Sequence, residues 1–371
     1  MPGATGEADP VSDPVPPAEP APPKKKRSVK GLVGFVLGVA LLVYVFVSRD
    51  GVDVLLEVVE RVGDRWPLLL VPYALNGIFA IACYRVALPR RGRDVPLGVL
   101  VHVERSAAIL TSVLPFANYG GNFAKVILLS HWYTGAEVLA AGAWGALATG
   151  ICNSLAAIGP FVALAMGFAE PSGVALVAAA TIATSFPALF ILTMVRKGLA
   201  RRVTSLLRHF PRLFSEERRE KWLGKAEDFD RHLSSAVGER KGDFTLHVLL
   251  KACVQVARVG EIWLIIELLG LPGGLLAALL FNAINRTTAQ LLSFVPGGFG
   301  VLELSAMIGF SALGFSTEDG LAVALALRFH FFVNMLVSAS ALATAPRVRA
   351  KYPPRTAGAP ATTEASATPT P

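Results

Sequence analysis

The sequence predicts an all-α polytopic membrane protein with about six full spans and two re-entrant helical hairpins that form an inverted repeat. Composition is the first reason, because hydrophobic residues make up 53% of the 371 positions and charged residues only 17%, below the roughly 25% usual in soluble domains. The second reason is that the apolar residues gather in blocks near the length that crosses a bilayer. The third is that two of these blocks share one sequence pattern and are broken by proline and glycine.

The two ends of the chain predict disordered tails. Residues 1–30 are rich in proline and end in a basic stretch, and residues 347–371 are rich in proline, threonine and alanine. Such segments carry too little apolar surface to form a core. The apolar run 31–47 does not finish in a small-residue cleavage site, so we expect an uncleaved first span and place the membrane domain at residues 31–346.

Further apolar blocks continue the domain. They lie at residues 67–88, 97–117, 137–168, 173–195, 245–270, 275–295, 300–315 and 319–345. Among them, residues 196–243 mix many basic residues with apolar ones, which predicts either an amphipathic helix on the inner leaflet or a solvated linker helix. Basic residues also follow the last block, whereas residues 48–65 have an acidic excess and residues 271–274 carry no base. Since basic loops stay in the cytoplasm, both termini are predicted to lie there.

Charge and cysteine content argue against other classes of protein. We interpret the net charge of +8 as loop charge facing anionic lipid, and no basic-aromatic nucleic-acid module is present. Cys83, Cys152 and Cys253 stand singly in apolar blocks, so neither a metal site nor a disulfide framework is predicted. We also expect no cofactor.

Two of the apolar blocks contain an internal repeat. The stretches RSAAILTSVLP at 105–115 and RTTAQLLSFVP at 286–296 each run from arginine to proline, with an offset of 181 positions (286 minus 105). The same register pairs Asn122 with Glu303, so a polar residue follows each proline at the same distance. For the loop charges to keep their predicted sides, each block has to return to the face that it entered. Two re-entrant hairpins of opposite entry are the plan of many secondary transporters, whose broken helices meet near the midplane.

The stretch PGGFGVLE, at residues 296–303, marks the second turn. Glycines permit a tight turn, and a helix that begins near Gly300 would point its free amides at the centre of the membrane. Arg286 lies ten residues ahead of Pro296, where lipid offers no counter-charge. Arginine forks bind phosphate or carboxylate through two hydrogen bonds, so the implied ligand is anionic. The alternative is an internal ion pair, such as Arg286 with Glu303, that only joins the hairpins.

These considerations select the candidate site residues. The predicted site for an anionic headgroup consists of Arg105, Asn118, Asn122, Lys125, Arg286, Gln290, Gly297, Gly298, Gly300 and Glu303. Weaker candidates for lining a cavity are Arg258, Glu261, Arg328 and His330. Arg258 and Glu261 could instead pair with each other, since they share a helical face. Lys251, also on that face, is expected to extend toward the cytoplasm. No catalytic set is predicted.

The PGGFGVLE stretch, the arginine ten residues before its proline and an earlier LP…GG…K turn resemble the lysylphosphatidylglycerol synthase transmembrane region. This region is the flippase-like domain of bacterial aminoacyl-phosphatidylglycerol synthases/flippases, and the resemblance covers residues 31–346. The family usually has Gly-Glu-x-x-Arg in its first hairpin, where this chain has Gly121, Asn122 and Lys125. The resemblance therefore leaves Glu303 as the lone acid of the site.

The resemblance implies movement of a lipid or lipid-linked headgroup between the leaflets of a bacterial inner membrane. The partner would be an anionic phospholipid or a polyprenyl phosphate, with envelope-assembly proteins as further partners. Full synthases carry a soluble transferase domain after the membrane region, and the short stretch after the last span leads us to expect no lysyl transfer here. Two alternatives are a non-catalytic partner or scaffold of an envelope lipid or glycan assembly complex, and an intramembrane lipid-modifying enzyme with Glu303 or His330 as acid/base.

Overall fold

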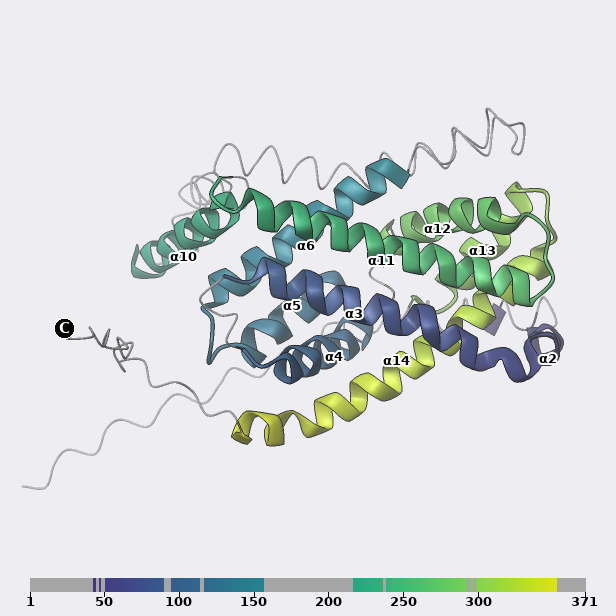
Figure 1. Cartoon of the computed structure of the whole chain (residues 1–371), viewed down its shortest axis with the longest axis horizontal. Coiled ribbons are helices and arrows are strands. Elements are labelled where there is room, and N and C mark those ends of the chain that lie inside the picture. Colours follow the sequence, from purple (N-terminus) through teal and green to yellow (C-terminus); the bar gives the residue numbers. More distant parts are fainter. Residues whose placement is uncertain are drawn as a thin grey trace, which may run out of the picture.

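The computed structural model describes residues 43, 44, 47, 51–89, 95–113, 117–156, 216–235, 238–291, 295 and 298–351 (Figure 1). Its elements are α2 (Gly51–Val62), the 3₁₀ helix η1 (Gly63–Leu69), α3 (Leu70–Ala87), α4 (Leu97–Val113), α5 (Ala117–Leu128), α6 (Gly135–Ala156), α10 (Glu216–Ser235), α11 (Lys241–Leu268), α12 (Gly274–Leu291), α13 (Val301–Ala312) and α14 (Thr317–Lys351). No strand occurs among the described residues, so the predicted all-α class is confirmed for this part of the chain. The N-terminal tail, the 173–195 block, nearly all of the 31–47 block and residues 352–371 lie outside it.

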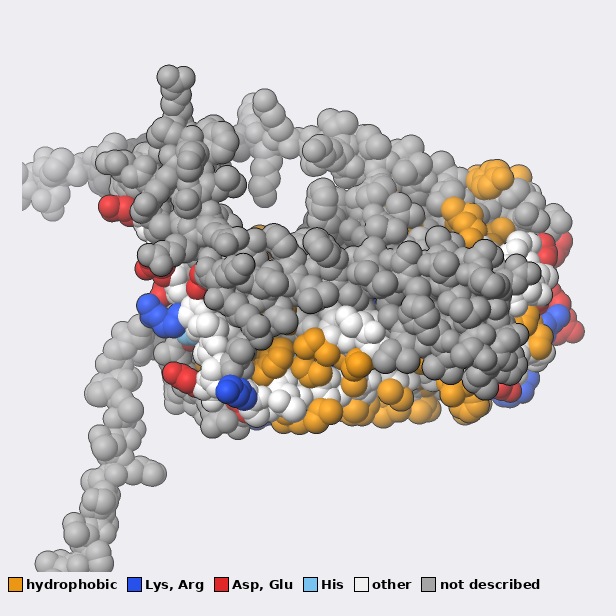
Figure 2. Space-filling view, turned by 90° about the horizontal axis from the view of Figure 1, so that it is seen from above, with side chains coloured by type: hydrophobic (Ala, Val, Ile, Leu, Met, Phe, Trp, Pro, Cys, Tyr) orange, Lys and Arg blue, Asp and Glu red, His pale blue; other side chains and the backbone are white. Residues whose placement is uncertain are grey.

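Three stretches of the described residues are long and apolar enough to cross a bilayer. They are Val52–Ala87, Gly135–Leu155 and Thr317–Ala345, as expected of an integral membrane protein. Figure 2 shows exposed hydrophobic side chains along one face, between two ends where charged side chains gather. The predicted span at 245–270 does form a helix, α11, but Lys251, Arg258 and Glu261 interrupt its apolar character and it is not among the three stretches.

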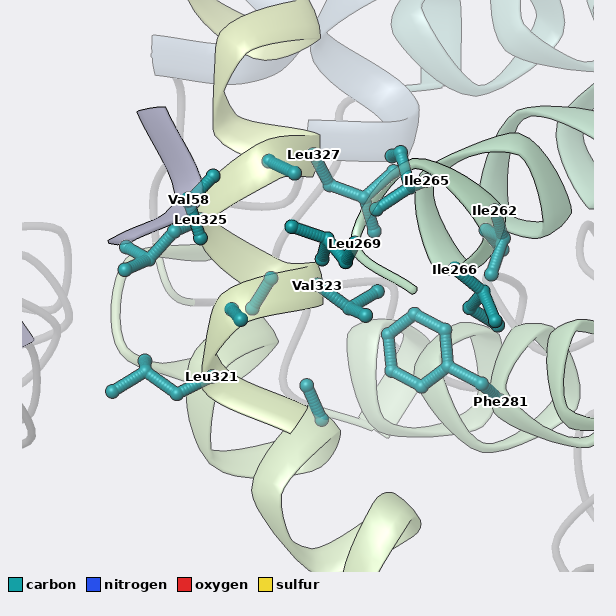
Figure 3. Packing of buried hydrophobic residues seen from close by; sticks show 14 of the residues in the cluster. Val58, Ile262, Ile265, Ile266, Leu269, Phe281, Leu321, Val323, Leu325 and Leu327 are labelled. Atoms are coloured by element: carbon teal, nitrogen blue, oxygen red, sulfur yellow. The ribbon is translucent and has the colours of Figure 1, made fainter. Parts of the chain in front are cut away.

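Buried side chains of α2, α11, α12, α13 and α14 form the larger hydrophobic core (Figure 3). From α11 come Ile262, Ile265 and Ile266, whose spacing places them on one helical face. Phe281 of α12 faces them and meets Phe310 of α13 with ring centroids 5.4 Å apart. This core fixes the second hairpin region against α11 and α14.

Each predicted hairpin region consists of two packed helices rather than one continuous straight helix. Helix α4 packs against α5, and α12 packs against α13. The two pairs lie toward opposite ends of the long axis in Figure 1. The predicted start of a helix near Gly300 is confirmed, because α13 begins at Val301 and Gly300 adopts a positive φ of 74°. Gly298 also has a positive φ, 58°, which glycine tolerates without strain; Gly297 lies outside the described residues.

Arg240, the residue before α11, joins three helices. Its guanidinium donates to the carbonyl oxygens of Val86 at 2.8 Å, Ala87 at 3.3 Å and Leu88 at 2.9 Å, at the C-terminus of α3. It also lies over the ring of Trp144 on α6, 4.6 Å from the centroid. These carbonyls have no partner within their own helix, so a cation stabilises them and fixes α11 to α3 and α6.

Helix α10 is part of the basic segment predicted at 196–243. It packs against α6, and its Leu233 is buried. A cavity of about 630 Å³ lies between α10, α6 and the start of α11, with Glu137, Trp144 and Ser234 among its lining residues. The described part of the segment is therefore docked on the protein.

Candidate functional site

Arg328 of α14 holds the PGGFG turn. Its Nε donates to Glu303 Oε1 at 2.7 Å, and its Nη2 donates to Glu303 Oε2 at 2.9 Å and to the carbonyl oxygen of Gly298 at 2.8 Å. The guanidinium also lies over the rings of Phe299 and Phe331, 4.8 and 5.4 Å from their centroids. Glu303 is 0% exposed and Arg328 7%. Both oxygens of the Glu303 carboxylate are bound by Arg328, and we call this pair the clamp. It fixes the PGGFG turn and the start of α13 to α14.

This clamp overturns the alternative in which Arg286 pairs with Glu303. The Glu303 carboxylate takes its two-pronged contact from Arg328 instead. The reason is geometric, because α13 and α14 pack directly against each other and bring the first turn of α13 to the middle of α14. Arg286 on α12 is left without this counter-charge.

Arg105, in the first hairpin region, is held by neutral groups. Its Nη1 donates to the Tyr73 hydroxyl at 2.8 Å and to Asn334 Oδ1 at 3.2 Å, and the hydroxyl donates to Asn334 Oδ1 at 3.3 Å. Gly77 of α3 makes room for it, since a Cβ there would lie 2.1 Å from Arg105 Nη2. The predicted site residue therefore joins α4 to α3 and α14 without a carboxylate.

Lys125 and Asn122 of α5 also have protein partners. Lys125 Nζ lies 2.5 Å from Glu104 Oε2 of α4 and 4.2 Å from the ring centroid of Tyr84. Asn122 packs on Gly142 of α6, where a Cβ would come within 3.0 Å of its amide group. These two predicted site residues join α4, α5 and α6.

Glu261 of α11 and His330 of α14 form a second pair. His330 Nδ1 makes a short contact with Glu261 Oε1, and the ring meets Tyr73 edge-on with centroids 4.6 Å apart. The alternative pairing of Glu261 with Arg258 is not formed. The structure thus joins two of the weaker candidates to the Tyr73–Arg105 contact.

Three cations lie on α11 and α12, which pack against each other. We call Lys251, Arg258 and Arg286 the cationic cluster. Arg286 is close enough for its charge to repel those of Arg258 and Lys251. In the part of the chain that the structure describes, no ion pair joins any of the three to a carboxylate. Nη1 of Arg286 and Nε of Arg258 are buried without a hydrogen-bond partner.

Amide side chains surround the cationic cluster. Gln255 lies between its two members on α11, on the same helical face, and donates to Asn153 Oδ1 of α6 at 3.4 Å. Gln255 Oε1 and Asn282 Oδ1 are buried without a donor. The site therefore offers unsatisfied cationic donors beside unsatisfied oxygens, which suits a ligand that carries both an anionic group and hydroxyls.

The buried donors and acceptors without partners make ligand binding at this site favourable in free energy. A buried donor or acceptor left without a partner costs about 1–3 kcal/mol, and more when it is charged. Buried charges are normally paired for this reason. An anion seated among the three cations would remove the repulsion and satisfy the orphaned donors together.

The structure brings together part of the predicted site. Arg286 and Arg258 both belong to the cationic cluster, and Lys251 lies near enough to Arg286, Glu104 and Lys125 for their charges to act on it. The extension of Lys251 toward the cytoplasm stays a prediction. The sequence did contain a sign that Lys251 belongs to this cluster, because its spacing along α11 places it on the same helical face as Gln255 and Arg258. The side chains of Asn118 and Gln290, like Gly297, lie outside the described residues.

Comparison with known proteins identifies one family. The family model described as the lysylphosphatidylglycerol synthase TM region matches residues 31–338. The match includes both hairpin regions and every member of the cationic cluster. No curated protein and no solved structure gives a significant match.

Proposed function

We propose, because this chain belongs to the lysylphosphatidylglycerol synthase TM region family, that it moves the anionic headgroup of a membrane lipid, or of a lipid-linked group, between leaflets. Membership supports a membrane protein related to lipid modification or flipping. The observation that carries the finer proposal is the cationic cluster. It is a concentration of positive charge on partly buried side chains, and no ion pair joins these side chains to a carboxylate among the described residues.

A structural role does not account for the cationic cluster. A central arginine costs at least about 2.5–3.5 kcal/mol on insertion scales, and Arg328 offsets this cost with a dedicated carboxylate. Among the described residues, Arg286 and Arg258 have no such carboxylate. Taking a phosphate out of water costs free energy. Hydrogen bonds from guanidinium groups in a site of low dielectric offset this cost.

Each residue of the cationic cluster has a role in this proposal. Arg286 and Arg258 hold the phosphate through their forks, and Lys251 adds a point charge. Gln255 and Asn282 accept hydrogen bonds from headgroup hydroxyls through their free oxygens.

The other predicted contacts position the site. Arg105, Lys125 and Glu303 have protein partners, so they hold the helices in place. Asn118, Gln290 and Gly297 stay predicted ligand contacts.

We place the two helix pairs in the membrane as re-entrant hairpins that enter from opposite faces. Their position toward opposite ends of the long axis supports this arrangement (Figure 1). The protein would lie in a bacterial inner membrane with both termini in the cytoplasm, as the basic residues of the loops favour. The broken helices then bring the cationic cluster toward the midplane, where an inverted repeat binds its substrate.

Transport is favoured over catalysis by the state of the acid/base candidates. Glu303 is fully engaged by Arg328, and His330 is paired with Glu261. Neither has a nucleophile beside it among the described contacts. The proposed protein therefore moves its lipid without changing it.

Leaflet exchange in liposomes tests the proposal. The purified protein is reconstituted with a trace of phosphatidylglycerol that carries a fluorescent tail, and dithionite then bleaches the outer leaflet. Wild type should let the bleach reach nearly all of this lipid, and labelled phosphatidylcholine should exchange more slowly. The variant Arg286→Gln should slow exchange at least tenfold, about 1.4 kcal/mol in the barrier.

A matched variant controls for loss of a positive charge. Arg231 is 75% exposed on α10, so Arg231→Gln should exchange at the wild-type rate. Wild type that exchanges no faster than protein-free liposomes, or Arg286→Gln at full speed, would rule the proposal out.

A further inference from the structure

The pair of Glu261 and His330 differs in accessibility between its members. The Glu261 side chain is 2% exposed, whereas the His330 side chain is 21% exposed. The carboxylate is therefore buried, while the imidazole is partly exposed. A histidine is the side chain whose charge changes most readily near neutral pH.

We propose that Glu261 and His330 bind a proton that travels with the lipid headgroup, so that a transmembrane pH gradient drives the lipid movement. The inference rests on the proposed function and names its energy source. It assigns to this pair a co-substrate, the proton, and a role separate from holding the headgroup.

A comparison within α14 separates this pair from a structural one. Two residues before His330, Arg328 also binds a buried carboxylate, but a guanidinium keeps its charge at any physiological pH. Its fork is further occupied by Gly298, so this clamp has one state. His330 has two states, and its Nδ1 faces Glu261, so the proton is gained and lost at Nε2.

Arg258 links the proton to the anion. It lies three positions before Glu261 on α11, a spacing at which two side chains of a helix can meet. When His330 carries the proton, its charge holds Glu261, and Arg258 is left for the headgroup. When the proton leaves for solvent, Glu261 loses its cation and turns to Arg258, where it competes with the headgroup.

Proton and headgroup therefore favour each other's binding. The coupling is reciprocal, because each ligand must change the affinity for the other by the same factor. The proton and the anion cross in the same direction, and the headgroup accumulates on the alkaline side.

The groups that face this part of α14 are consistent with the assignment. They are Tyr73 from α3, Arg105 from α4, Glu261 from α11 and Glu303 from α13, whereas His102 of α4 contacts α14 farther along, at Ala341. The charge of Glu303 is compensated by Arg328. Helix α2 meets α14 with apolar side chains such as Val58 (Figure 3). Among these described groups, Glu261 is the carboxylate in direct contact with the His330 ring.

A pH gradient across the reconstituted liposomes tests the inference. The lumen is held at pH 8 and the bath at pH 6, with valinomycin and potassium clamping the voltage at zero. The fraction of fluorescent phosphatidylglycerol bleached by a dithionite pulse shorter than the exchange time is then compared with that at symmetric pH. Wild type should shift the lipid at least twofold toward the inner leaflet, relative to protein-free vesicles. Glu261→Gln and His330→Gln should return the distribution to the symmetric value.

Matched substitutions outside the pair serve as controls. Glu57→Gln on α2, at a side chain 52% exposed, and His131→Gln between α5 and α6 should respond to the gradient as wild type does. Exchange in wild type that ignores the gradient would overturn the proton inference and leave the proposed function intact. A full gradient response in Glu261→Gln or His330→Gln would overturn the assignment to this pair. No exchange in wild type under any condition would contradict the proposed function first.

A binding measurement covers variants that do not exchange lipid. In detergent, short-chain phosphatidylglycerol should raise the melting temperature of wild type more at pH 6 than at pH 8. Loss of this pH dependence in Glu261→Gln supports the coupling, and an unchanged dependence contradicts it.

Discussion

Arginines that look alike in the sequence have different surroundings in the folded chain. Arg328 is paired with a carboxylate, Arg105 is held by a phenol and an amide, and Arg286 has a buried nitrogen without a partner. A guanidinium keeps its charge in all three places. The surroundings therefore decide whether the residue holds the fold together or receives a ligand.

The clamp between Arg328 and Glu303 predicts a mutational pattern in stability. Arg328→Met leaves a buried carboxylate without its cation, which should cost about 3–5 kcal/mol of unfolding free energy. Adding Glu303→Leu should restore most of this loss, because apolar residues of similar size often replace a buried pair at little cost. Thermal unfolding in detergent measures both variants. A single variant as stable as wild type would show that the clamp does not hold the turn.

Substitution of Arg286 should change the stability in the opposite direction. Arg286→Gln removes a cation that repels two neighbours, so the ligand-free protein should gain on the order of 1 kcal/mol while losing exchange. Functional sites commonly trade stability for activity in this way. The same unfolding experiment checks it, and destabilisation as large as that of Arg328→Met would mean that Arg286 has a structural role.

Sequence reasoning identified the unusual residues better than their partners. Arg286, Glu303 and His330 stood out because charge is costly in an apolar block. Helical periodicity orders residues on one helix but does not say which faces of two helices meet. For this reason the sequence offered Arg286 as the alternative partner of Glu303, and it did not identify Tyr73 as a partner of Arg105.

At the scale of elements, α13 and α14 approach each other at Gly320. A Cβ on Gly320 would lie 2.5 Å from the carbonyl oxygen of Ala306, which is backbone and cannot move away easily. Gly320→Ala should therefore separate the two helices, destabilise the protein by about 1–3 kcal/mol and slow exchange. The measurement is thermal unfolding beside the liposome assay.

Gly145 on α6 is the control for this substitution. A Cβ there would meet nothing within 4 Å, so Gly145→Ala should be neutral or gain about 0.5–1 kcal/mol from helix propensity. Equal effects of the two alanines would show that the close approach does not matter.

The elements themselves were largely predictable. The glycines of PGGFG predicted the start of α13, because positive φ at Gly298 and Gly300 is what glycine permits. The character of α11 was less predictable, since its charges break the apolar pattern while other helices cover them. The 48–65 stretch was assigned to a loop side by its charge alone. It contains the amphipathic helix α2, whose apolar face consists of Val54, Val58 and Val62 and packs on the core.

At the scale of the molecule, the helices predict a topology. Helix α2 and the turn between α11 and α12 lie toward one end of the long axis, and α10 lies toward the other (Figure 1). With the basic end in the cytoplasm, single cysteines at Leu55 and Pro272 should react with an impermeant thiol reagent added outside. A cysteine at Glu220 should react only after the membrane is opened, in a background without Cys83, Cys152 and Cys253. Reaction of position 220 from outside would reverse the orientation.

The central claim is that an anionic headgroup occupies the cationic cluster of the whole folded protein. The most direct test is thermal unfolding of the purified protein with short-chain phosphatidylglycerol, read against phosphatidylcholine. At 100 times its dissociation constant, the anionic lipid should stabilise wild type and Arg231→Gln by about 2.7 kcal/mol and leave Arg286→Gln unchanged. Equal stabilisation of Arg286→Gln, or of wild type by phosphatidylcholine, would contradict the account.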